Sequence, residues 1–156
     1  MTYVFDNSPL STLFRNYYRR RFPTLWQHFD ELVDNGDIVS TREVRREIED
    51  GPDESLREWA AQNGELFTMP NAEEGAFVAR IYAVQHFQQN IERQKILKGG
   101  RIADPFVIAK AAVANRTVVT MEQWRPNAVK IPNICDHFGI PCMTLEGFME
   151  TEGWEF

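Results

Sequence analysis

The sequence predicts a three-layer α/β/α sandwich with a mostly parallel sheet of about five short strands. Short runs of β-prone residues alternate with apolar helical patterns along the whole chain. The chain has 156 residues, 43% of them hydrophobic and 12% aromatic, which is enough to bury a sizeable core. It contains no repeat, low-complexity tract or interdomain linker, so we expect residues 1–156 to form a single domain.

The expected strands are short and rich in β-branched or aromatic residues, and each is bounded by turn-forming residues. They fall at residues 3–5, 37–40, 65–69, 117–120 and 140–144.

The expected helices show apolar residues every three or four positions and end at glycine, asparagine or proline. They cover residues 9–16, 22–35, 42–49, 54–62, 72–97, 103–115, a short segment around 135–137, and 145–149. The longest of them carries an apolar stripe from Phe77 to Ile91 and is expected to end at Gly99–Gly100.

The first strand is followed at once by a sharp turn that carries an acid. Asp6 comes directly after the strand, Ser8 is a favourable helix N-cap, and Pro9 suits the first helical position. Ligands and catalytic groups collect at the carboxyl ends of strands in open α/β sheets. We therefore expect Asp6 to lie at a functional edge of the sheet.

Three further acids fall where this fold could bring them near Asp6. Glu47 lies on the helix after the second strand, Asp104 starts the helix at 103–115, and Glu122 follows the fourth strand. Carboxylates gathered at one point repel each other unless a cation lies between them, and hard cations prefer oxygen ligands. Each acid also has a simpler interpretation: Asp6 as a turn residue, Asp104 as an N-cap, and Glu47 and Glu122 as solvated charges.

Charge, cysteine content and the lack of long apolar runs limit the cellular locations and partners that we expect for this protein. The formal charge of −6 argues against broad, nonspecific binding of nucleic acid, although a metal in an acidic site offsets negative charge. Two cysteines, no secretory signal and no long apolar run predict a protein of the reducing cytoplasm that does not cross a membrane.

Four motifs occur in a characteristic order along the chain: Val-Phe-Asp-Asn-Ser at the N-terminus, Val-Arg-Arg-Glu-Ile, Ala-Asp-Pro-Phe-Val-Ile-Ala, and Val-Val-Thr-Met-Glu. Together they resemble the PIN domain, the fold of VapC-type toxin ribonucleases, and more closely a stand-alone PIN-like branch of toxin–antitoxin loci. The resemblance covers nearly the whole chain.

The resemblance implies a set of site residues. The first aspartate of the family matches Asp6, the small hydroxyl residue after it matches Ser8, and the helical glutamate matches Glu47. The central aspartate matches Asp104. The fourth acid usually follows a Thr-x-Asp pattern, whereas this chain has Thr120-Met121-Glu122, which leaves a metal-binding role for Glu122 open.

The resemblance further implies a Mg²⁺- or Mn²⁺-dependent endoribonuclease that is inhibited by an antitoxin protein and often forms a homodimer. RNA contacts would come from basic and aromatic residues. The candidates are Tyr17, Tyr18, Arg19, Arg20 and Arg21, which we expect beside the site, with Arg45 and Arg46 flanking Glu47. The alternative for the first five is a solvated helix end whose tyrosines pack on the core.

Two other functions remain in view. A phosphoryl-transfer protein on a similar sheet is disfavoured, because Ser8 stands where a haloacid-dehalogenase-like enzyme has its second aspartate. A non-catalytic PIN-like binding module is the other alternative, and the glutamate at position 122 keeps it open.

Overall fold

The structure is a computed structural model in which five parallel strands form one sheet in the order β3-β2-β1-β4-β5. It describes residues 1–97 and 102–156, with side chains left out from 94 to 97. The strands are β1 (Tyr3–Phe5), β2 (Ile38–Thr41), β3 (Phe67–Thr68), β4 (Thr117–Val119) and β5 (Cys142–Met143). The predicted α/β sandwich with a parallel sheet is confirmed.

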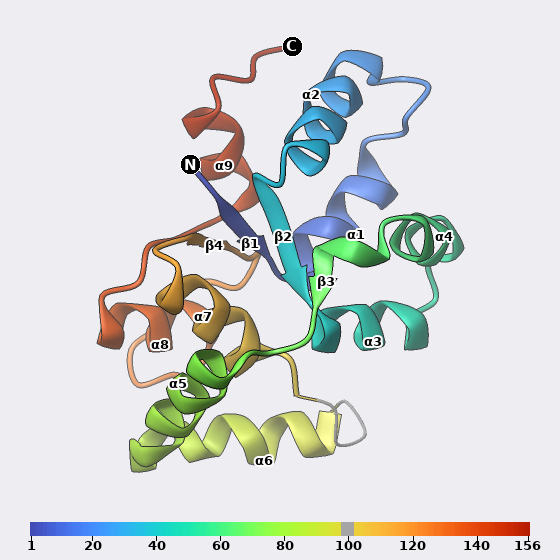
Figure 1. The fold of residues 1–156 in the computed structure, drawn as a ribbon. Coiled ribbons are helices and arrows are strands. Elements are labelled where there is room, and N and C mark those ends of the chain that lie inside the picture. The colour runs from blue at the N-terminus through green and yellow to red at the C-terminus, as the bar shows by residue number, and fades with distance from the viewer. Residues whose placement is uncertain (98–101) are drawn as a thin grey trace.

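The helices lie on both faces of this sheet (Figure 1). α1 (Asn7–Asn16) and α2 (Pro23–Asp34) connect β1 to β2, and α3 (Arg42–Asp50) and α4 (Glu54–Gln62) lead from β2 towards β3. A crossover of α5 (Ala72–Ala83), α6 (Gln88–Leu97) and α7 (Asp104–Val113) returns the chain to β4. α8 (Ile131–Phe138) then connects β4 to β5, and α9 (Leu145–Thr151) follows.

Aromatic side chains of β1 fill the core on one face. The ring of Phe5 meets Phe29 of α2 at 6.1 Å and Phe148 of α9 at 5.1 Å, and all three residues are fully buried. The opposite face of the sheet is covered by α7, whose central residues are buried along nearly the whole helix. β1 is therefore fixed from both sides, which immobilises the turn that follows it.

The prediction of one continuous helix at residues 72–97 is wrong. The backbone leaves the helical region at Val84 (φ −83°, ψ 108°), passes through a 3₁₀ turn at Gln85–Phe87 and resumes as α6. The Gln88 amide donates to the carbonyl of Tyr82 at 3.0 Å, which satisfies a group that the interruption exposes. The apolar spacing is the same in a straight and in a broken helix, so periodicity alone could not reveal the bend. The predicted end at Gly99–Gly100 lies outside the described residues.

Two helix starts also differ from expectation. α1 begins at Asn7 with Asp6 in the N-cap position, so Ser8 lies inside the helix. α7 begins at Asp104 itself, with Ala103 in the N-cap position and no capping bond from a side chain. Within the described ranges, no helix is long and apolar enough to cross a bilayer.

Candidate functional site

The four predicted acids lie towards the carboxyl edge of the sheet. β1 and β4 pair in parallel, with Phe5 opposite Val119, so Asp6 and Thr120 leave the sheet side by side. α3 begins directly at the carboxyl end of β2 and carries Glu47. α7 leads back into a parallel strand, and its first residue, Asp104, therefore starts on the same side of the sheet (Figure 1).

Asp6 is held by neutral hydroxyl donors. Its side chain is only 6% exposed, and its Oδ2 accepts hydrogen bonds from Thr120 Oγ1 at 3.0 Å and Ser8 Oγ at 3.2 Å. Its backbone N–H donates to the carbonyl of Val119 at 3.0 Å. These bonds fix the carboxylate without neutralising its charge.

The two hydroxyls are themselves oriented by backbone amides. The N–H of Met121 donates to Ser8 Oγ at 3.0 Å, and the N–H of Glu122 donates to Thr120 Oγ1 at 3.3 Å. Each hydroxyl therefore accepts one bond from the backbone and gives its single proton to Asp6. Ser8 and Thr120, the two residues that the sequence suggests as supports for the site, both donate to Asp6.

Asp104 is held by a residue that the sequence patterns did not single out. Asn90 of α6, 3% exposed, donates from Nδ2 to Asp104 Oδ2 at 3.1 Å, and Asp104 itself is 2% exposed. Burial, together with the nearby Asp104 carboxylate, raises the pKa of Tyr82 above its ordinary value. The available signal was the position of Asn90 three residues after Phe87, on the apolar stripe of the predicted long helix.

α3 presents two glutamates one turn apart on the same face. Glu43 is buried at 7% exposure and Nε of Arg42 donates to its Oε2 at 2.9 Å, whereas the predicted ligand Glu47 is half-buried. Lys110 of α7 is also buried and donates to Thr68 Oγ1. Burial lowers the pKa of Lys110, opposed by the charges of Glu74 and Glu43, so Glu43 belongs to this second group of charges.

Glu122 is placed in the loop after β4, half-buried. Its Oε2 accepts from the N–H of Ile131, the first residue of α8, at 3.4 Å. A carboxylate at that position interacts favourably with the helix dipole. Glu122 thus has a structural contact that the sequence did not predict.

The arrangement suits a hard cation that is bound mainly through water. Among the residues that the structure describes, no three His, Cys, Asp or Glu side chains form a group that could hold a metal. Mg²⁺ commonly uses one or two carboxylates and retains several waters, so such a group is not required. The hydroxyl groups bonded to Asp6 and the neutral amide bonded to Asp104 are compatible with Mg²⁺ or Mn²⁺, which prefer oxygen ligands.

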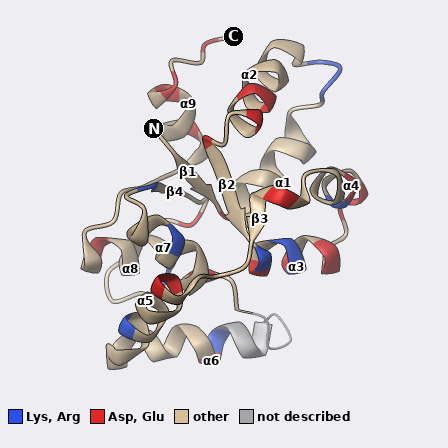
Figure 2. Ribbon diagram, viewed as in Figure 1, with Lys and Arg blue, Asp and Glu red and all other residues tan. Residues whose placement is uncertain are grey.

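The predicted RNA-contacting residues fall into two separate groups (Figure 2). Arg45 and Arg46 lie on α3, close to the carboxyl edge of the sheet. Tyr17 to Arg21 lie in the connection between α1 and α2, at the end of α1 remote from Asp6. These five residues are therefore not beside the acids, contrary to expectation.

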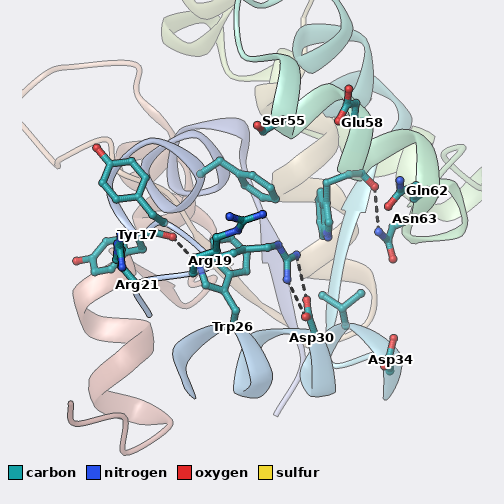
Figure 3. A pocket seen from close by; sticks show the side chains of 15 residues that line it. Tyr17, Arg19, Arg21, Trp26, Asp30, Asp34, Ser55, Glu58, Gln62 and Asn63 are labelled. Carbon is teal, nitrogen blue, oxygen red and sulfur yellow. Dashed lines mark hydrogen bonds and ion pairs between the residues drawn. The ribbon is translucent and has the colours of Figure 1, made fainter. Parts of the chain in front are cut away.

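A pocket of about 840 Å³ lies at this second group, between the α1–α2 connection, α2 and α4 (Figure 3). Arg19 is at its centre, with its guanidinium 4.2 Å from the ring centroid of Trp26 and bonded to Asp30 at 2.9 and 3.3 Å. The ring of Tyr17 packs against the core, 5.3 Å from that of Phe22, as the simpler interpretation predicted, whereas Tyr18 is 62% exposed. This large hollow is thus distinct from the acids.

A family model described as domain of unknown function DUF4411 matches residues 3–156. The chain belongs to this family. No curated protein matches the chain. The match covers both Asp6 at the first strand and the last helix, α9, so the whole fold described above is the family's domain.

Proposed function

We propose that this DUF4411 protein is a metal-dependent endoribonuclease of the PIN-like type that hydrolyses RNA phosphodiester bonds. The observation that carries the proposal is the buried carboxylate of Asp6, fixed by Ser8 and Thr120 at the carboxyl end of β1. Hydrogen bonds from neutral donors orient a carboxylate without placing a competing positive charge beside it. The order of the four sequence motifs supports the same assignment.

Asp6 and Asp104 would hold Mg²⁺ or Mn²⁺, with Glu47 as a further ligand. The cation would lower the pKa of a bound water and stabilise negative charge on the phosphate. Ser8 and Thr120 hold the Asp6 carboxylate in one orientation, so little reorganisation is needed on binding. Glu122 would act through water from the loop after β4, since its Oε2 already contacts Ile131.

RNA would approach over α3, where Arg45 and Arg46 can contact phosphates close to the acids. The proposal includes the biological setting: a cytoplasmic toxin held inactive by an antitoxin protein, and a possible homodimer. None of the described helices is a membrane-spanning candidate, which agrees with action away from a bilayer.

Two observations favour a second candidate, a PIN-like module that binds partners without cutting RNA. No group of three candidate ligands occurs in the described part of the chain, and Glu122 has a structural role at α8. If this alternative holds, the acids would contribute to RNA or protein binding only.

Expression of the chain in a bacterial host tests the proposal. Wild type should arrest growth, and Asp6→Asn, which keeps the size of the side chain and one acceptor oxygen, should permit it. Both proteins should accumulate to the same level in soluble form. Equal growth of the two strains at equal protein levels would contradict toxicity through this site.

A further inference from the structure

Asn90 connects three segments that are distant in the sequence. From α6, its Nδ2 donates both to Asp104 Oδ2 at 3.1 Å and to the carbonyl oxygen of Val129 at 3.0 Å. Val129 lies in the loop that leads from Glu122 to α8 and is 8% exposed. A single buried amide therefore joins the start of α7 to the loop that carries the fourth acid.

The orientation of this amide is fixed by chemistry. Both of its neighbours, a carboxylate oxygen and a carbonyl oxygen, can only accept hydrogen bonds, so the NH₂ group must face them. The Oδ1 atom then points away from both and, among the described residues, has no hydrogen-bond partner although it is buried.

A neutral donor has a specific consequence for Asp104. Lysine or arginine in this position would pair with the carboxylate and compete with any cation. The Asn90 amide instead fixes one oxygen of Asp104 without adding a positive charge beside it. Ser8 and Thr120 likewise donate hydrogen bonds to Asp6 from neutral hydroxyl groups. Among the described residues, each of the two buried aspartates thus receives a hydrogen bond from a neutral donor.

We propose that Asn90 is a positioning residue for Asp104, and that it sets the affinity of the site for a divalent cation. The inference rests on the proposed function in requiring a cation site, and it adds a residue from α6 to that site. Ligand-orienting partners of this kind typically change metal affinity by about 10- to 100-fold when they are removed.

Asn133 offers a matched control. It is also a buried asparagine, its Nδ2 donates to the carbonyl oxygen of Arg125 at 2.5 Å, and its Oδ1 likewise has no hydrogen-bond partner within the described ranges. None of its described hydrogen bonds reaches a carboxylate. Asn90→Ala and Asn133→Ala should therefore lose similar packing and hydrogen bonding, but only the first should change Asp104.

The test measures Mn²⁺ binding by calorimetry to wild type, Asn90→Ala and Asn133→Ala, with chemical unfolding in EDTA as the measure of fold stability. Asn90→Ala should weaken Mn²⁺ binding by about 10-fold or more, and Asn133→Ala should leave it unchanged. Asn90→Ser, which keeps a small polar group, serves as the second variant if Asn90→Ala does not fold, and it should also weaken binding.

The outcomes separate the two proposals. Wild-type Mn²⁺ affinity in both Asn90 variants would overturn the role of Asn90 and leave the proposed nuclease intact. Equal weakening in the Asn90 and Asn133 variants would overturn it as well, because the effect would then be general. Absence of saturable Mn²⁺ binding in wild type would overturn the cation site, and the Asn90 role with it.

Discussion

The carboxyl edge of the sheet and the pocket at the α1–α2 connection are both polar, but they hold charge in different ways. At the edge, Asp6 and Asp104 are buried and receive hydrogen bonds from neutral donors. At the pocket, Arg19 and Asp30 pair with each other while remaining 43% and 45% exposed. Buried charges interact strongly with a cation, whereas an exposed pair is screened by water. The pocket at the α1–α2 connection is therefore a poorer candidate for chemistry than the carboxyl edge of the sheet.

The strongest contrast is expected between two matched Asp→Asn substitutions. Asp104→Asn should reduce Mn²⁺-dependent RNA cleavage by about 100-fold or more, because several kcal/mol of cation-mediated stabilisation depend on its charge. Asp30→Asn, in the pocket, should change the rate by less than about twofold, since its exposed ion pair contributes little. Initial rates on one RNA at saturating Mn²⁺ provide the measurement. A comparable loss in both variants would place the pocket in the active site.

A smaller contrast is expected in fold stability. Thr120→Val keeps the shape of a side chain that is 1% exposed but removes a donor to Asp6 and an acceptor for the Glu122 N–H. It should lower the free energy of unfolding by about 1–3 kcal/mol. Arg19→Ala removes an exposed ion pair and a contact with Trp26 and should cost about 1 kcal/mol or less. Urea unfolding in EDTA measures both free energies. A greater loss of stability from Arg19→Ala than from Thr120→Val would contradict the expected difference between the two regions.

The smallest expected effect is on RNA binding, when either of the two groups of arginines is removed. Arg45→Ala/Arg46→Ala on α3 should weaken binding of single-stranded RNA by about 10-fold and reduce the slope of its salt dependence by about 0.7 for each phosphate that the variant no longer binds. Arg20→Ala/Arg21→Ala, with side chains at the remote end of α1, should have the weaker effect. Binding to catalytically inactive Asp6→Asn protein at several salt concentrations measures both. A larger loss from the second double variant would make the pocket the principal RNA surface.

The strand ends could be located from the sequence because they are set by local chemistry. The turn after β1, in which Ser8 lies two residues from Asp6, and the acid at the start of α7 follow from short patterns of residue type. Thr41, in the N-cap position of α3, accepts from the N–H of Val44 at 3.1 Å. These features depend on neighbours within a few residues and are accessible without a fold.

The features that the sequence did not predict have a common physical origin in long-range packing. Tyr17 to Arg21 follow Asp6 closely in sequence, but α1 has ten residues and carries the chain about 15 Å away from the strand end. The break at Val84 and the contact between Asn90 and Asp104 depend on how α6 packs against α7 and the loop at Val129.

The most direct test of the cation site is cleavage of a single-stranded RNA by wild type and by Asp6→Asn, in Mn²⁺ and in excess EDTA. Wild type should cleave in Mn²⁺, stop in EDTA and recover when Mn²⁺ is restored, while folded Asp6→Asn should remain inactive throughout. Cleavage by wild type that persists in excess EDTA, or cleavage by Asp6→Asn at the wild-type rate, would contradict a catalytic cation held at Asp6.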